Sequence, residues 1–230
     1  MNRITSKTFR FLGELARNND RDWFNANKER YIEEVREPLC AFIEAFAPKL
    51  ATIDPQLVAD SRPNGGSLLR VYRDTRFTKD KRPYHSNAGI SFRHIRGKGV
   101  VAPEIYLHIE PGAVYASAGM WNPPAESLKR IRDAIVDQPE RWKRLRGGLD
   151  EYDDALKRTP RGYDPEHPLA EDLKNRNFTQ STDFTQKEAG APGFSNQLAR
   201  SCRRAAPLME FLAYAVDAGS LRSSGSRRDG

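Results

Sequence analysis

Apolar residues at helical spacing dominate the first third of the chain. One stripe carries Phe9, Leu12, Leu15 and Ala16. Asn18-Asn19 follows and tolerates a left-handed helix end, and Asp20 is placed to cap a second, longer helix. The stripe of the second helix runs through Phe24, Tyr31, Val35, Leu39, Phe42 and Phe46. Pro38 lies inside this stripe and predicts a kink or a break.

The middle of the chain changes to two-residue alternation, which predicts strands. Apolar and polar residues alternate between Gly66 and Asp74, over residues 88–93, over residues 104–110 and from Val114 to Met120. Turn residues separate these segments. Four strands at this spacing, with no long helix between them, favour an antiparallel meander over a parallel sheet.

The last part is predicted to be mainly helical. One helix buries Leu128, Ile131 and Ile135, and another opens at Pro139. A loop-rich stretch precedes a final helix at roughly residues 195–216. We therefore predict one α+β domain over residues 1–218, with a mainly antiparallel central sheet of about four or more strands. N-terminal and C-terminal helices pack on that sheet, and residues 219–230 form a flexible basic tail.

Composition supports a folded domain with a basic bias. The 230 residues are 38% hydrophobic and 30% charged, which is typical of a globular protein. A formal net charge of +7 favours acidic partners. Two cysteines suit a reducing compartment, and no apolar run predicts a signal peptide or a membrane helix. These features predict a cytoplasmic, soluble protein with no membrane contact, and they leave its oligomeric state open.

The segment 70–85 concentrates the positive charge. It carries Arg70, Arg73, Arg76, Lys79, Lys81 and Arg82. Only two acids, Asp74 and Asp80, accompany these six cations, and aromatic residues are interleaved with them. A folded segment with this composition is typical of an anion-binding site, because the arginine fork matches phosphate and carboxylate oxygens.

Short motifs follow one another along the chain in a characteristic order. They are residues 18–24 with Lys28 and Tyr31, residues 70–77 with Lys79, Lys81, Pro83 and Tyr84, residues 119–121, and residues 160–163 with His167-Pro168. Their order and spacing resemble the bacterial and fungal family catalogued as domain of unknown function 2461, over roughly residues 5–217. The resemblance implies one compact domain and implies no reaction or ligand.

We predict that the ligand-binding residues come from the basic segment and from the second helix. They are Arg70, Arg73, Arg76, Lys79, Lys81, Tyr72, Tyr84, Lys28 and Tyr31. The alternative is a structural network, in which Arg73 pairs with Asp74 or Asp80. Lys28 and Tyr31 share a helix face with Phe24, and such a cluster is more often core packing with a lysine that reaches to solvent.

A second polar cluster lies on the predicted strand 104–110. With its apolar residues in the core, Glu104, Tyr106, His108 and Glu110 share the opposite face. Histidine beside glutamate is typical of proton transfer, but a solvated sheet face has the same pattern. His108 and Asp74 are the candidates for catalysis. The four histidines and two cysteines predict no metal site, and no motif predicts a cofactor.

Three functions are compatible with these patterns. The first is binding, with or without processing, of a phosphorylated or acidic small molecule at a basic aromatic site on the sheet. The second is nucleic-acid binding by the same surface, with Tyr72, Phe77 and Tyr84 stacking on bases. The third is a non-catalytic interaction protein in which the arginine–aspartate pairs are architectural. The pattern does not decide whether the protein is an enzyme.

Overall fold

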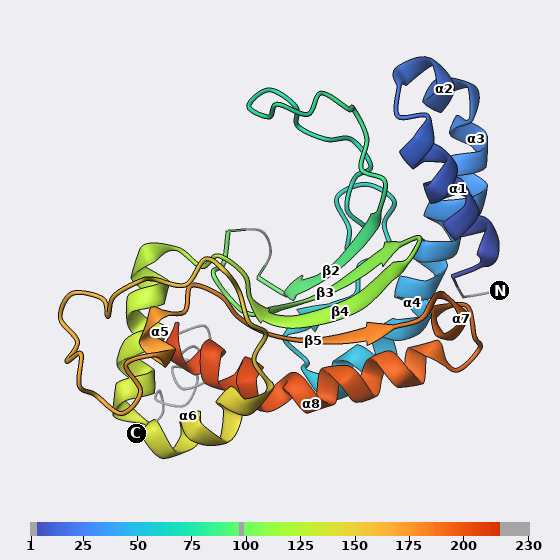
Figure 1. Cartoon of the computed structure of the whole chain (residues 1–230). Coiled ribbons are helices and arrows are strands. Elements are labelled where there is room, and N and C mark those ends of the chain that lie inside the picture. The colour runs from blue at the N-terminus through green and yellow to red at the C-terminus, as the bar shows by residue number, and fades with distance from the viewer. Residues whose placement is uncertain (1–3, 97–98, 217–230) are drawn as a thin grey trace, which may run out of the picture.

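Five antiparallel strands form the centre of the computed structural model, which describes residues 4–96 and 99–216. The strands are adjacent in chain order: β1 Leu57–Val58, β2 Ala88–His94, β3 Glu104–Glu110, β4 Ala113–Met120 and β5 Phe178–Phe184. Figure 1 shows helices against one face of this sheet, whereas the other face lies open below a long loop. The predicted α+β domain with an antiparallel sheet and flanking helices is confirmed.

The alternation in β3 determines which face is covered. Ile105, Leu107 and Ile109 are buried, and the polar residues between them are half-buried on the other side. The buried face packs against the helices α4 Glu37–Ile53 and α8 Phe194–Ala215, and these elements share one hydrophobic core. Removing these side chains from water is the main source of stability for this part of the fold.

The N-terminal helices form a column beside the sheet (Figure 1). This column contains α1 Ser6–Arg17, α2 Arg21–Ala26, α3 Lys28–Tyr31 and the π-helical turn η1 Ile32–Arg36, and it continues into α4. The Asp20 side chain caps α2 by accepting a hydrogen bond of 2.9 Å from the Trp23 N–H. The predicted cap is therefore present.

Pro38 accounts for the interruption between α3 and α4. It lies in the first turn of α4 and has no N–H to donate to the Glu34 carbonyl, its α-helical partner. The Thr8 hydroxyl of α1 donates to that carbonyl instead, at 2.6 Å. The helix widens into η1 at this point, and a π-turn of this kind is often found at functional sites.

The C-terminal helices enclose a second, smaller core. It lies among α5 Ala125–Asp137, α6 Pro139–Leu145, β5 and α8. Trp142 is fully buried there, and its indole N–H donates to the Asp172 carboxylate at 2.9 Å. The short elements are η2 Arg146–Gly148, η3 Asp172–Lys174 and α7 Gln186–Ala189.

One predicted strand is absent from the sheet, and one strand of the sheet was not predicted. The segment between Gly66 and Asp74 is not a strand. β1 pairs with the C-terminal end of the β2 edge, at Arg93 and His94, so this segment can pair only with the rest of that edge. Only isolated bridges remain, Leu68 with Ile90 and Tyr72 with Tyr84. The strand β5 was not predicted, because its sequence Phe-Thr-Gln-Ser-Thr-Asp-Phe has apolar residues only at its ends.

Two further predictions concern the C-terminal tail and the absence of a membrane-spanning helix. The predicted basic tail, residues 219–230, lies outside the described residues. Within the described part of the chain, no helix combines the length and the apolar character needed to cross a membrane.

Candidate anion site

Residues 72–84 form a loop, here called the arm, that rises from the edge of the sheet above its open face (Figure 1). Its root is held by backbone hydrogen bonds, from the Arg73 N–H to the Pro83 carbonyl at 2.9 Å and from the His85 N–H to the Val71 carbonyl at 2.8 Å. The Asn19 side chain completes the anchor, because it donates to the Tyr84 carbonyl and accepts from the Tyr84 N–H, both at 3.0 Å.

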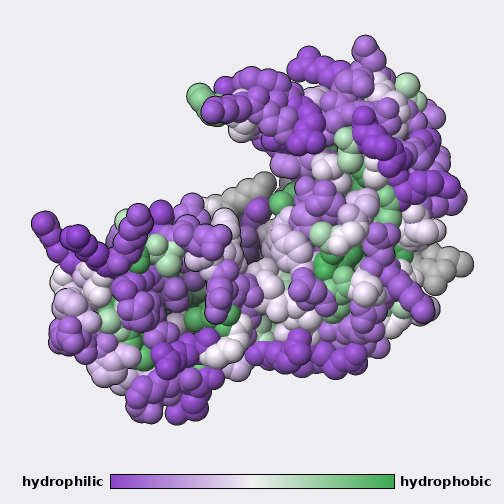
Figure 2. All heavy atoms as spheres, in the orientation of Figure 1, coloured by the Kyte–Doolittle hydropathy of each residue, from purple (hydrophilic) through white to green (hydrophobic). Residues whose placement is uncertain are grey.

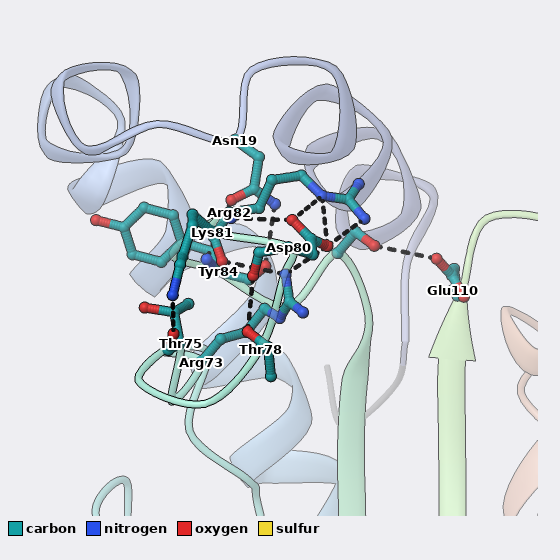
Figure 3. Close-up of polar contacts among 10 residues, drawn as sticks. Asn19, Arg73, Thr75, Thr78, Asp80, Lys81, Arg82, Tyr84 and Glu110 are labelled. Carbon is teal, nitrogen blue, oxygen red and sulfur yellow. Dashed lines mark hydrogen bonds and ion pairs between the residues drawn. The ribbon is translucent and has the colours of Figure 1, made fainter.

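Most of the arm's cations are paired with the arm's own acids. Figure 3 shows Asp80 between two arginines: it accepts from Arg73 at 2.8 Å and from Arg82 at 2.7 Å. Asp74 pairs with Arg76 at 2.7 Å. The Lys81 ammonium donates to the Thr75 carbonyl at 2.9 Å. The two carboxylates thus offset part of the positive charge that the sequence concentrates here.

The pairs Asp74–Arg76 and Asp80–Arg82 follow one local rule, which sequence reasoning missed. In each pair the aspartate accepts from the backbone N–H and the guanidinium of the arginine two residues later. Asp60 and Arg62 repeat the arrangement. Hydrogen bonds from these arginines lower the pKa of Asp74 and of Asp80. The recurring Asp-x-Arg spacing was the signal in the sequence that identifies these pairs.

A pocket of about 270 Å³ lies between the N-terminal helices and the segment 63–72. Three of its lining residues are basic, Lys28, Arg36 and Arg70. The residues come from α3, from the end of η1 and from the segment that precedes the arm. No lining residue among those described is acidic. The pocket therefore gathers positive charge from three places in the chain.

The three pocket cations differ in their partners from the arm arginines Arg73, Arg76 and Arg82. In the described ranges 4–96 and 99–216, no hydrogen bond or ion pair reaches the side chains of Lys28, Arg36 or Arg70. Like charges that share a site raise its energy unless an opposite charge offsets them. The described lining thus carries three cationic residues and no acid, while outside the lining the Arg70 charge contributes to the lowered pKa of Asp74.

Aromatic rings build one wall of the pocket. The Phe24 ring contacts those of Tyr31 and Tyr72, with centroids 5.4 Å and 5.9 Å apart. Burial raises the pKa of Tyr31 to about 12 although the Arg36 charge lowers it. Tyr31 is therefore protonated at neutral pH, and its O–H can donate a hydrogen bond to an anion.

The predicted ligand-binding residues divide into two groups. Lys28, Tyr31, Arg70 and Tyr72, which is the first residue of the arm, line the pocket. The remainder, Arg73, Arg76, Lys79, Lys81 and Tyr84, belong to the arm. The Tyr84 ring is 4% exposed and stacks on Phe24 at 4.1 Å, so its faces are not open to a ligand. The lining residue Arg36 was not predicted, because no local pattern distinguishes it from other helix-surface arginines.

The polar face of β3 forms a hydrogen-bonded chain. The His108 Nε2 lies 3.1 Å from Glu110 and its Nδ1 lies 3.1 Å from the Tyr106 hydroxyl. Because a carboxylate only accepts, we assign the proton to Nε2 and the lone pair to Nδ1. The Ser86 hydroxyl donates to Glu110 at 3.2 Å, which ties the segment that follows the arm to the sheet.

The hydrogen-bonded residues Tyr106, His108 and Glu110 are of the types that transfer protons, but their arrangement does not identify a substrate. Burial raises the pKa of Tyr106 to about 12, so the hydroxyl stays protonated and donates to His108. Figure 2 shows the molecule hollowed above the sheet, between the arm and the lobe that contains α5. Within the described residues, no group of three or more His, Cys, Asp or Glu is arranged to hold a metal ion.

A comparison with models of known protein families assigns the chain to one family. The model described as "Conserved hypothetical protein (DUF2461)" matches residues 7–211. The chain belongs to this family, so the resemblance of its motifs is confirmed. A search of curated proteins found no match. Membership brings no activity with it, and function has to be inferred from the site.

Proposed function

We propose that the protein binds a small phosphorylated ligand in the pocket lined by Lys28, Arg36 and Arg70. The single observation that carries this proposal is that three cationic residues line one pocket without an acid in its described lining. Arginine–phosphate bonds are charge-assisted and often bidentate, whereas lysine supplies a compact charge. Both types are present here.

The dimensions of the pocket favour a small anionic group. Its volume of about 270 Å³ lies just below the ~300–1,000 Å³ that drug-sized ligands occupy. The aromatic wall excludes water on one side, which strengthens the attraction between a bound anion and the cations. The Tyr31 hydroxyl adds a neutral donor to the three charged ones.

The two other functions have less support. In the nucleic-acid alternative Tyr84 stacks on a base, and its ring is already stacked on Phe24. The arm's paired arginines match the architectural alternative, but that alternative leaves the pocket cations unexplained. A steep fall of affinity with salt would favour a polymer of phosphates, because several counterions would be released.

Thermal unfolding in the presence of oxyanions tests the proposal. Inorganic phosphate and simple phosphate esters, compared with chloride at equal ionic strength, should raise the melting temperature, since a ligand stabilises the state that binds it. The double substitution Arg36→Ala/Arg70→Ala should abolish the rise. Each lost charge-assisted hydrogen bond weakens binding by about 1.5–3 kcal/mol. The matched control is Arg144→Ala, which removes an exposed arginine from α6 and should keep the response.

The melting temperature without ligand separates a binding site from a structural network. If the pocket cations only repel one another, the double variant should be as stable as the parent or more so. A large loss of stability in the ligand-free double variant, with no oxyanion stabilising the parent, would overturn the proposal and assign these side chains a structural role.

A further inference from the structure

Tyr72 occupies a distinctive position at the pocket. It lines the pocket and yet 48% of its surface is exposed. Its neighbours Phe24 and Tyr84 meet it at interplanar angles of 68° and 53°, so neither ring lies parallel over a face of Tyr72. An amphipathic ring that is half inside a pocket and half in solvent can contact both a buried group and a group at the mouth.

The Tyr72 backbone is held in place before any ligand arrives. It forms an antiparallel bridge with Tyr84, and the hydrogen bonds of Arg73 and His85 across the arm root flank this bridge. A ring fixed on such a frame loses little conformational freedom when another ring stacks on it. Tyr72 is thus a preorganised stacking surface beside the three cations.

We infer that the phosphorylated ligand is a nucleoside monophosphate, with its phosphate among Lys28, Arg36 and Arg70 and its base stacked on Tyr72. This inference rests on the proposed function. The pocket volume of about 270 Å³ suits a phosphate with its attached sugar, and the base then lies at the mouth against the exposed ring. A nucleobase stacked on this ring would add binding free energy, and any base could do so because every base has a flat π-face.

Calorimetric titration with matched probes tests the inference. The probes are inorganic phosphate, ribose 5-phosphate and adenosine 5′-monophosphate. We expect the nucleotide to bind about fivefold or more tightly than ribose 5-phosphate, since stacking on an aromatic side chain contributes about 1–3 kcal/mol per base. Tyr72→Ala should remove this margin and leave the affinity for ribose 5-phosphate, whereas Tyr72→Phe should keep the margin.

A second tyrosine provides the matched control. Tyr214 on α8 is 59% exposed and does not line this pocket, so Tyr214→Ala should behave like the parent protein. A 5′-phosphorylated oligonucleotide should bind no more tightly than the mononucleotide. Tighter binding of the oligonucleotide would overturn the assignment to free mononucleotides in favour of a strand end.

The outcomes distinguish this inference from the function on which it rests. If ribose 5-phosphate and the nucleotide bind equally, or if the margin survives in Tyr72→Ala, the base does not stack on Tyr72 and only the inference falls. If no phosphate-bearing probe binds the parent protein, the proposed function falls and the inference falls with it.

Discussion

The arm and the pocket contain the same kinds of cation in opposite surroundings. In the arm, Arg73, Arg76 and Arg82 each bind a carboxylate at 2.7–2.8 Å. In the neighbouring pocket, Arg70 and Arg36 have no such partner among the described residues. A cluster of positive charge therefore indicates a binding site only where the protein's own carboxylates do not already pair with the cations.

Local sequence spacing and backbone conformation explain why the arm arginines are paired with acids and Arg36 is not. Asp74 and Asp80 precede Arg76 and Arg82 by two residues in irregular segments, where such side chains can meet. Glu34 precedes Arg36 by two residues as well, but i,i+2 side chains do not face each other on a helix. Glu34 lies 3.4 Å from Arg30 instead. Arg36 is thereby left to the pocket.

The largest expected effect concerns the contact that supports the π-turn before Arg36. Thr8→Val removes the hydroxyl that donates to the Glu34 carbonyl and leaves that carbonyl without this part-buried hydrogen bond. The free energy of unfolding should fall by about 1–3 kcal/mol, measured by urea denaturation. Phosphate affinity should fall with it if the π-turn places Arg36.

The control for this substitution is Thr52→Val. The Thr52 hydroxyl also donates to a helix carbonyl, that of Lys49 at 2.7 Å, but on an exposed surface. Its loss should change stability by no more than about 0.5 kcal/mol. Equal effects of the two substitutions would contradict the role given to Thr8.

Adding a single acid to the pocket should give its cations a carboxylate partner, as the arm arginines have. Asn64 is exposed and lines the pocket, so Asn64→Asp adds a carboxylate near the three cations. Phosphate should then bind about fivefold or more weakly, because unit charges a few ångströms apart repel by about 1–4 kcal/mol near a surface. Unchanged phosphate affinity in calorimetry would argue against an anion site here.

The smallest effect is expected from loosening the arm. Asp80→Asn removes the charge that joins Arg73 and Arg82. The amide hydrogens of residues 73–82 should exchange faster, while the global melting temperature and the phosphate affinity stay at parent values. Slow exchange in the variant would show that backbone contacts alone order the arm.

The same carboxylate predicts a pH dependence. Hydrogen bonds from Arg82 and Arg73 hold the folded-state pKa of Asp80 below its ordinary value of 3.8. Its contribution to arm stability is therefore complete above about pH 3.8 and is lost only as pH falls through the lowered folded-state pKa. An NMR titration of the Asp80 carboxyl carbon should have its midpoint well below 3.8, and a midpoint at 3.8 would refute the pairing.

Much of the fold could be predicted because it depends on local periodicity. The stripe of α1, the cap at Asp20 and the alternation of β3 each lie within one short segment. β5 escaped prediction because it is polar in its centre and is held by pairing with β4. The segment between Gly66 and Asp74 alternates like a strand, yet β1 shares the edge that it would need.

The amino-acid sequence alone determined the α+β class and the position of the basic segment. Its Asp-x-Arg spacing also encodes the arm pairs at Asp74 and Asp80, although these pairs were recognised only in the structure. Only the tertiary structure decided that Lys28, Arg36 and Arg70 surround one pocket. The physical reason is distance along the chain. Partners two residues apart meet through local turn geometry, whereas side chains separated by tens of residues meet only where the packing of helices against a sheet brings them together.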